Sequence, residues 1–290
     1  MDERAALALV SQAVGEAGDD AAVVDGQVLT IDMLHESTDF PDGTTRYTVG
    51  WRTVGASLSD VAAMGADANA AVAVYGDSGF DERELLRFVE GARDVAESVN
   101  ARYVGGDLDE HREFTVATTA LGWTDRPVYR SGASPGELVA VTGTLGRSAA
   151  AVEAFDRGDR ETANDLFRFQ PRVAAGTALR EYASAMMDSS DGLARSLHQL
   201  AAASDCGFDV RSGDVPVDDA VAERADTESE ALDMGMYFGE DFELVFTLPE
   251  AALEAARSVV DVPITVIGEV TDGGLRLDGK PLPDRGYTHG

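Results

Sequence analysis

Hydrophobic positions along the chain follow two alternating periods, which divide it into short strands and longer helices. Apolar residues that recur every three or four positions predict helices, and compact apolar runs rich in β-branched residues predict strands. The predicted helices cover residues 4–15, 47–64, 81–99, 193–203 and 250–259, with further helices across about 146–182. The predicted strands cover residues 28–31, 70–75, 101–104, 114–121, 138–142, 185–187, 208–210, 243–247 and 264–270.

A connector separates two halves that both mix strands and helices. The stretch "RSGASPGE", residues 130–137, has the Gly, Pro and Ser of a loop. It predicts a boundary between residues 1–130 and residues 131–290. Neither half contains a Rossmann glycine fingerprint or a Gly-x-x-x-x-Gly-Lys loop. We therefore expect an α/β chain of the α+β type, built as two α/β sandwich domains, each a sheet with helices packed on one face.

The chain carries an extreme negative charge. It has 53 acidic residues against 23 basic ones, a formal net charge of −30, and Lys280 is its sole lysine. The acids are spread through a well-patterned chain that is 44% hydrophobic, which argues against an acidic disordered tail. A partner-binding acidic patch and a surface adapted to high intracellular salt remain as alternatives, and the global spread favours the second. Scarce basic residues disfavour nucleic acid as a partner.

The sequence also bears on compartment and redox chemistry. It has no apolar run of about eighteen residues and no N-terminal signal with a basic start, so we expect a soluble, cytoplasmic protein without a membrane partner. Cys206 is the only cysteine, which excludes an internal disulfide and a cysteine-based zinc cluster.

Aspartates gather at predicted strand and helix ends. "AGDDAAVV" carries Asp20, "LTID" is expected to end a strand at Asp32, and "YVGGDLDE" is expected to close a strand at Gly106 and Asp107. Each is also an ordinary turn sequence. Asp60, in "SLSDVAAMGA", is harder to dismiss because a helix of small apolar residues predicts its burial. A buried carboxylate needs a compensating partner, and a divalent cation is one.

A further acidic group precedes the helix expected at 193–203. In "MMDSSDGLARSLHQL", Asp188, Ser190 and Asp191 stand just before the amphipathic stretch. One interpretation is helix capping, and the other is binding of a metal or a metal–phosphate complex. Glycine-rich turns are expected to let the backbone approach a phosphate; they contain Gly105, Gly106, Gly136, Gly143 and Gly146. Strand-end aspartates together with such turns indicate Mg²⁺ and a polyphosphate.

The chain resembles the thiamine-monophosphate kinase family in an ordered set of motifs: "GDDAAVV", "LSDVAAMGA", "GGD", "RSGASPGELVAVTGTLGRSAA", "DSSDGL" and "GEDFELVFT". The similarity runs from about residue 18 to 287. That family belongs to the aminoimidazole ribonucleotide synthetase-like superfamily of ATP-using enzymes. The resemblance implies phosphorylation of thiamine monophosphate to thiamine diphosphate by ATP with several Mg²⁺ ions and no phospho-enzyme. It also implies a homodimer whose N-terminal sheets join into a barrel.

The resemblance implies a set of site residues as well. The implied metal ligands are Asp20, Thr30, Ile31, Asp32, Asp60, Asp107, Asp188 and Asp191. The implied ATP contacts are Gly106, Asp107, Arg130 and Ser190, and the implied substrate contacts are Asp39, Glu240 and Tyr287. No general base is expected, because the acceptor phosphate is already anionic near neutral pH and catalysis rests on positioning and charge neutralisation.

The chain departs from the family pattern at three points. Ile31 stands between Thr30 and Asp32 where the family usually has Ser-Thr-Asp, so it offers a metal only its backbone carbonyl. Asp39 occupies a place where a substrate-contacting His is common, and Phe238 replaces a Gly before Gly239. The alternatives are aminoimidazole ribonucleotide synthetase, selenophosphate synthetase, or a non-catalytic acidic metal-binding protein.

Overall fold

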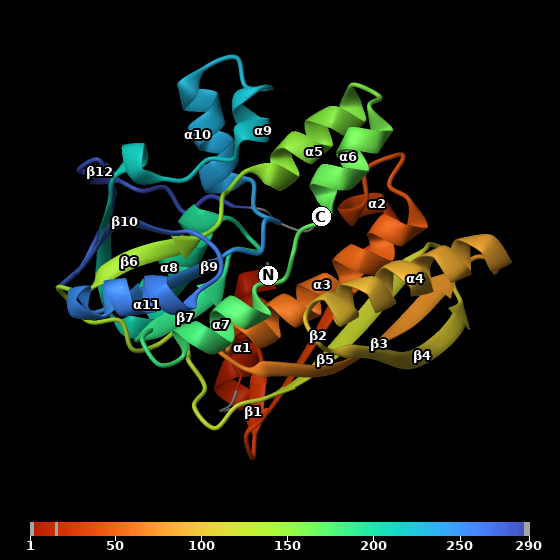
Figure 1. Cartoon of the computed structure of the whole chain (residues 1–290), viewed down its shortest axis with the longest axis horizontal. Helices are drawn as coiled ribbons and strands as arrows, with labels where there is room; N and C mark the ends of the chain where they lie inside the picture. The colour runs from red at the N-terminus through yellow and green to blue at the C-terminus, as the bar shows by residue number, and fades with distance from the viewer. Residues whose placement is uncertain (1–2, 15–16, 287–290) are drawn as a thin grey trace.

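Two β-sheets organise the chain, one from each half (Figure 1). The computed structural model describes residues 3–14 and 17–286. The first sheet has five strands in the order β1-β2-β5-β3-β4. They are β1 (Ala22–Val24), β2 (Gln27–His35), β3 (Asp67–Asp77), β4 (Arg102–Glu110) and β5 (Thr115–Trp123). Only β3 and β4 pair in parallel, and the connection that this requires is the helix α4 (Glu82–Ser98).

Helices α3 (Arg46–Ala63) and α4 cover one face of this sheet. They cross closely because each has a glycine at the contact. A Cβ built on Gly50 would lie 2.1 Å from the Phe88 carbonyl oxygen, and one on Gly91 would lie 2.0 Å from that of Tyr47. Helix α3 packs directly on the sheet, where it contacts β2, β3 and β5. Its polar side chains Ser57 and Asp60 form hydrogen bonds with residues of β2.

The opposite face of the five-stranded sheet is apolar and exposed. We call it the outer face; its exposed side chains include Leu29, Ile31, Met33, Val72 and Val74. Side chains of β2 alternate strictly, with Val28, Thr30 and Leu34 buried toward α3. In this chain the sheet is open, with β1 and β4 as its edges. The barrel expected across a dimer is therefore not formed within one chain.

The second sheet has seven strands in the order β12-β11-β8-β10-β6-β9-β7. They are β6 (Leu138–Thr142), β7 (Ala185–Asp188), β8 (Gly207–Val210), β9 (Leu244–Leu248), β10 (Ile264–Thr271), β11 (Leu275–Leu277) and β12 (Lys280–Pro281). Their neighbours are antiparallel except for β8 and β11, which run in parallel.

Helices cover both faces of this second sheet, so the prediction of helices on one face is wrong here. Met187 packs against Leu193, whereas its neighbour Met186 packs with Leu179 and Ala256 on the opposite side. Strands β7 and β9 are buried along their whole length, as expected of strands covered on both sides. The helices on one face are α8 (Leu193–Ser204) and α10 (Glu228–Tyr237), and those on the other are α7 (Val173–Leu179) and α11 (Leu253–Val259).

A helical hairpin links the two halves. Helices α5 (Arg147–Asp156) and α6 (Arg160–Phe167) stand over α3 in Figure 1. Ala150 and Phe155 belong to the same hydrophobic cluster as Val54 of α3. The strands before and after residue 130 therefore form separate sheets, but one hydrophobic cluster contains residues from both halves. The domain boundary at residue 130 stays a prediction.

Several predicted boundaries shift. β2 continues to His35, so Asp32 lies inside it, and β4 continues to Glu110, so the Gly-Gly-Asp stretch lies inside that strand. The remaining elements are α1 (Glu3–Ala13), α2 (Glu36–Asp39), α9 (Asp219–Ala222) and the 3₁₀ turns η1 (Ser212–Asp214) and η2 (Glu250–Ala252). Within the described ranges, no helix combines the length and apolar character that crossing a bilayer requires.

Candidate active site

A pocket of about 470 Å³ lies between the two halves. Its walls come from the segment before β1, from β2 and α3, from the connector, and from the segment after β7. The lining includes Asp19, Asp20, Thr30, Ile31, Asp32, Asp60, Arg130, Ser190 and Asp191. We call it the acidic pocket. Five of these nine are aspartates, so the site is built for a ligand that brings positive charge.

Three carboxylates meet beside the acidic pocket. Asp20, Asp60 and Asp188 each present an oxygen, and these oxygens lie within 4.8 Å of one another. The Thr30 hydroxyl donates to Oδ2 of Asp60. Arg130 donates to both carboxylate oxygens of Asp20, at 2.9 and 3.1 Å. Arg130 thus pairs with only one of the three carboxylates, that of Asp20.

Asp188 gives the clearest test of whether the residues of this cluster fit a metal ion. It is 1% exposed, and the backbone N–H of Ser190 lies 3.3 Å from its Oδ1. Its Oδ2 is buried and receives no well-aligned hydrogen bond among the described residues, although the nearby Ser59 hydroxyl lowers the pKa of Asp188. Buried polar atoms are nearly always satisfied in folded proteins. Because the unsatisfied atom is a carboxylate oxygen beside two others, the residues present fit a hard divalent cation such as Mg²⁺.

The electrostatics of the cluster agree with that fit. Burial raises the pKa of Asp60 well above its usual value, and the charges of Asp32 and Asp188 raise it further. Burial, followed by the charge of Asp20, raises the pKa of Asp188 to about 7, and the same two causes raise that of Asp19 to about 6. The cluster resists full ionisation without an added cation, and a bound metal reverses that balance.

Local sequence explains how α3 and β2 converge on this site. Ser57 precedes Asp60 by one helical turn, so both side chains point to the same side of α3. The Ser57 hydroxyl donates a 2.6 Å hydrogen bond to Oδ2 of Asp32. On β2, Thr30 and Asp32 alternate with the outward-pointing Ile31, whose side chain is 74% exposed. The Ile31 side chain therefore points away from those of Thr30 and Asp32, which leaves its backbone carbonyl as the atom it could offer a metal.

The sequence-predicted residues fall into three groups. The structure brings together Asp20, Thr30, Ile31, Asp32, Asp60, Arg130, Asp188, Ser190 and Asp191. Gly106 and Asp107 lie elsewhere, exposed on the edge strand β4. Asp39 and Glu240 line a different pocket, and Tyr287 lies outside the described residues.

Two of the glycines that were expected to approach a phosphate also have roles in the packing of this chain. A Cβ on Gly106 would meet the Ala73 carbonyl oxygen at 1.7 Å, so this glycine admits the neighbouring strand. A Cβ on Gly143 would lie 2.1 Å from the Glu243 carboxylate. The N–H of Gly146 donates to Asp241 at 2.6 Å. The backbone around Gly143 and Gly146 therefore accommodates carboxylates of the "GEDFEL" motif.

A second pocket of about 310 Å³ lies between residues 37–41, the α5–α6 hairpin and the loop that follows α10. We call it the aromatic pocket; its lining includes Asp39, Phe40, Phe167, Phe238 and Glu240. Asp39 is 7% exposed and accepts the backbone N–H of His35 at 2.7 Å. Rings and carboxylates in one pocket suit an aromatic cation. Arg52 of α3, which the sequence analysis missed, forms an ion pair with Glu240. The signal that could have found it is the one that marked Asp60, a charged residue within a helix of small residues.

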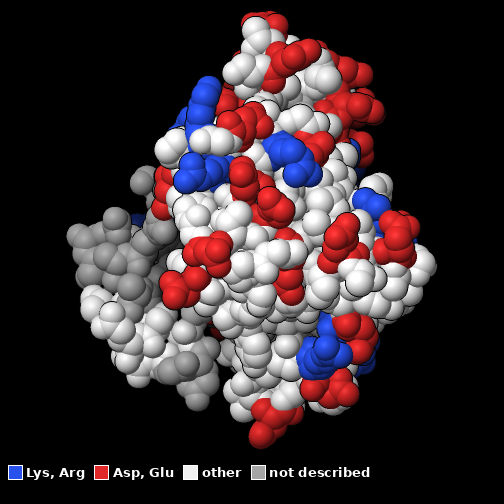
Figure 2. All heavy atoms as spheres, turned by 90° about the vertical axis from the view of Figure 1, so that its left-hand side faces the viewer, with Lys and Arg blue, Asp and Glu red and all other residues white. Residues whose placement is uncertain are grey.

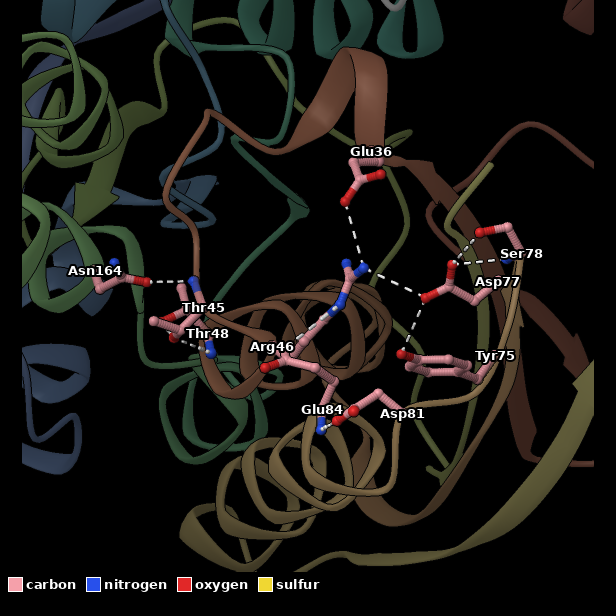
Figure 3. Close-up of polar contacts among 10 residues, drawn as sticks. All are labelled: Glu36, Thr45, Arg46, Thr48, Tyr75, Asp77, Ser78, Asp81, Glu84 and Asn164. Atoms are coloured by element: carbon pink, nitrogen blue, oxygen red, sulfur yellow. Dashed lines mark hydrogen bonds and ion pairs between the residues drawn. The ribbon is translucent and has the colours of Figure 1, made fainter. Parts of the chain in front are cut away.

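A cluster around Arg46 fixes the segment that forms one wall of the aromatic pocket (Figure 3). Arg46 Nη2 lies 3.4 Å from carboxylate oxygens of both Glu36 and Asp77, and its guanidinium lies over the Phe114 ring. At the other end of the segment, Asn164 accepts the Thr45 N–H at 2.9 Å and donates to the Gly43 carbonyl at 3.0 Å. Residues 36–45 are thus held from both halves of the chain.

Comparison with known proteins agrees with this architecture. The family model for the N-terminal domain of AIR synthase related proteins matches residues 18–124, and that for their C-terminal domain matches residues 134–280. The chain therefore belongs to the AIR synthase related proteins, with both of their domains present.

Relatives narrow the assignment. A thiamine-monophosphate kinase of Halobacterium salinarum is 63% identical over 291 residues and covers 100% of both chains. One of Methanospirillum hungatei is 39% identical, over 100% of this chain and 99% of the relative. A solved structure of AaThiL complexed with AMPPCP and TMP superposes with a TM-score of 0.90 at 27% identity, over 99% and 96% of the two chains. The chain is a member of the thiamine-monophosphate kinase family.

Proposed function

We propose that this protein transfers the γ-phosphoryl group of ATP to thiamine monophosphate, giving thiamine diphosphate and ADP, by direct in-line transfer with several Mg²⁺ ions. The observation that carries the metal part is the buried Oδ2 of Asp188, which receives no well-aligned hydrogen bond among the described residues, within the carboxylate cluster. Family membership supports the substrates, since relatives of this chain are thiamine-monophosphate kinases.

We propose that the metal ions and the ATP phosphates bind in the acidic pocket. The metal ligands proposed in and beside this pocket are Asp20, Thr30, the Ile31 carbonyl, Asp32, Asp60, Asp188 and Asp191. Asp107 is proposed as a further metal ligand and ATP contact, although it lies on β4, outside the acidic pocket of this chain. Arg130 and Ser190 are proposed to contact ATP from the pocket wall, and Gly106 from β4. When bound, Mg²⁺ supplies charge neutralisation between two anionic phosphates. The chain itself fixes its carboxylates on rigid elements and needs no general base.

We propose that the thiamine end of thiamine monophosphate binds in the aromatic pocket. The thiazolium ring of thiamine is cationic and flat, and the pocket offers the carboxylates of Asp39 and Glu240 together with the rings of Phe40 and Phe167. Tyr287 is proposed as a further substrate contact from outside the described residues. The residue at position 39 is thus an acid that favours the cation electrostatically, where the family pattern more often has a His.

We further propose that the outer face is a dimer interface. Exposed apolar patches of this kind on a sheet mark interaction sites. The five-stranded sheets of two copies facing each other through Leu29, Met33, Val72 and Val74 would bury these side chains and close the barrel that one chain leaves open.

We propose that the protein works in the cytoplasm at high salt concentration and that it does not bind nucleic acid. Figure 2 shows carboxylates scattered over one whole face, with the fewer basic side chains mostly beside them. The chain's net charge of −30 repels nucleic-acid phosphates, and salt screens its self-repulsion.

A coupled assay tests the function. ATP consumption by the purified protein in multimolar KCl and Mg²⁺ is expected to depend on thiamine monophosphate and to yield thiamine diphosphate in equal amount. Asp188→Asn is the matched inactive control. If ATP consumption depends instead on an aminoimidazole ribonucleotide precursor or on selenide, the protein has the activity of aminoimidazole ribonucleotide synthetase or selenophosphate synthetase, and the proposal is wrong. Metal binding without turnover would favour a non-catalytic protein and overturn the proposal.

A further inference from the structure

Arg52 of α3 reaches across to two walls of the aromatic pocket. It is 2% exposed although its guanidinium is charged. Nη1 donates to the carbonyl oxygen of Phe167, and Nη2 donates to Oε2 of Glu240 at 2.6 Å. The guanidinium carbon lies 3.6 Å from the centroid of the Phe167 ring. Phe167 and Glu240 both line the aromatic pocket, and one buried side chain from the other half of the protein holds both.

The loop that carries Glu240 needs such support. Gly239, Glu240 and Phe242 all have positive φ angles, of 85°, 61° and 56°. A glycine adopts that conformation freely, whereas a side chain with a Cβ does so at a cost that surrounding contacts must offset. The Glu240 carbonyl accepts the Ser148 hydroxyl at 2.6 Å and lies 3.4 Å from Arg52 Nη2. Arg52 therefore contacts both the backbone and the carboxylate of a strained residue.

We propose that Arg52 is a positioning residue for the thiamine end of the substrate. By binding Oε2 of Glu240 and stacking on Phe167, it fixes a carboxylate and an aromatic ring at the spacing that the flat cation meets. This assignment rests on the proposed function, in which thiamine monophosphate occupies the aromatic pocket. Arg52 is absent from the lining of that pocket and acts through the two residues it holds.

The same loop offers a matched control. Three residues after Glu240, Glu243 forms an ion pair with Arg172, whose Nε donates at 2.8 Å. Glu243 is 4% exposed, so this pair is also buried, yet neither partner lines the aromatic pocket. Loss of Arg172 reports what breaking a buried pair in this loop does to folding alone.

The experiment compares Arg52→Gln, Arg52→Lys and Arg172→Gln in multimolar KCl. The Michaelis constants for both substrates, the affinity for thiamine monophosphate measured calorimetrically without ATP, and the melting temperature are recorded. We expect Arg52→Gln to weaken thiamine monophosphate binding about tenfold or more, with the KM for ATP unchanged. Arg52→Lys, which keeps the charge, is expected to recover part of the loss. Arg172→Gln is expected to lower the melting temperature and leave both KM values in place.

Three results would overturn the assignment. One is a folded Arg52→Gln variant with wild-type affinity for thiamine monophosphate, and another is an equal loss in Arg172→Gln. If Arg52→Gln does not fold, Arg52→Lys is combined with Glu240→Gln. Independent, additive losses in that pair would show that Arg52 does not act through Glu240. Wild-type protein that neither binds nor turns over thiamine monophosphate would overturn the proposed function, and this assignment with it.

Discussion

The Ser57 hydroxyl on α3 donates a 2.6 Å hydrogen bond to Oδ2 of Asp32 on β2. Ser57 also lies 2.8 Å from the Thr118 hydroxyl, which donates in turn to the Thr53 carbonyl at 2.9 Å. Because an ionised carboxylate can only accept, the single proton of the Ser57 hydroxyl is the one directed to Asp32. Helix α3 thus orients Asp32 from behind, as buried hydroxyls commonly do for metal ligands.

Removing that donor should weaken metal use without unfolding the protein. In Ser57→Ala, Asp32 loses the partner that fixes its orientation, and we expect the Mg²⁺ concentration for half-maximal turnover to rise about tenfold or more. Mg²⁺ titrations of wild type and variant, with Mn²⁺ binding followed by electron paramagnetic resonance, measure the effect. Ser258→Ala removes a hydroxyl bonded to its own helix, to the Ala255 carbonyl, and should change nothing. An identical Mg²⁺ dependence in Ser57→Ala would contradict the role of Ser57.

Salt should stabilise the fold. With 53 acidic and 23 basic residues, the folded state concentrates like charges that the unfolded chain spreads apart. Raising the salt concentration from 0.1 M to 1 M shortens the Debye length from about 10 Å to about 3 Å. We expect the melting temperature and the activity to rise between 0.1 M and multimolar KCl. A flat or falling melting temperature would rule out this explanation of the composition.

The outer face should hold two chains together. Val74 is 41% exposed in the middle of that face. A charge there would be buried without a partner in a dimer, so Val74→Asp should convert the dimer to a monomer. Light scattering in high salt is expected to give about twice 30.6 kDa for wild type and 30.6 kDa for the variant. Val259→Asp, at a 49% exposed position of α11 in the other half, is the control. A monomeric wild type at micromolar concentration would argue against the interface.

Asp241 should make stability depend on pH. Its carboxylate accepts the N–H groups of Gly146 and Ser148 at the start of α5, and burial raises its pKa to about 7. A carboxyl whose pKa is higher in the folded state contributes most stability below its unfolded pKa of about 4, and loses that contribution as the pH rises through about 7.

Comparison with Asp241→Asn isolates this effect, because asparagine does not titrate. The melting temperature of wild type minus that of the variant is expected to increase as the pH falls from 8 to 5. Asp272→Asn, at an exposed turn after β10, should show a constant difference. A gap between wild type and Asp241→Asn that narrows on acidification would have the wrong sign.

Sequence reasoning singled out the residues of the carboxylate cluster because their signals are local. Asp60 is an acid in a helix of small apolar residues, and Asp188 is the one acid at the end of the buried strand β7, so each is recognisable from its neighbours. The helical and strand periods likewise placed α3, α4 and β5 within a few residues of their observed bounds.

The misses depend on contacts between distant parts of the chain. Gly143 faces Glu243, one hundred residues later, so its role as packing space for a carboxylate could not be read locally. Arg52 and Glu240 are 188 residues apart. A short apolar run such as residues 185–187 of β7 does not itself reveal whether one face of the strand or both are covered.

The last prediction concerns Asp60 and Asp188, which we expect to hold metal rather than support the fold. Replacing either with Asn keeps its shape and removes one negative charge. Turnover should fall about 10²-fold or more, the scale seen when one electrostatic stabiliser of a transition state is lost. Mn²⁺ binding should weaken in parallel.

The metal-free stability of these two Asn variants should not fall with their turnover. Burial and neighbouring carboxylates raise the pKa values of both groups, which means that their ionised forms are unfavourable in the folded protein. A neutral Asn removes that cost, so the melting temperature in chelator should stay level or rise. Mg²⁺ should then stabilise the variants less than wild type, since a ligand stabilises only the state that binds it. Near-normal turnover, or a metal-free fold that collapses, would show that these aspartates serve capping or packing instead.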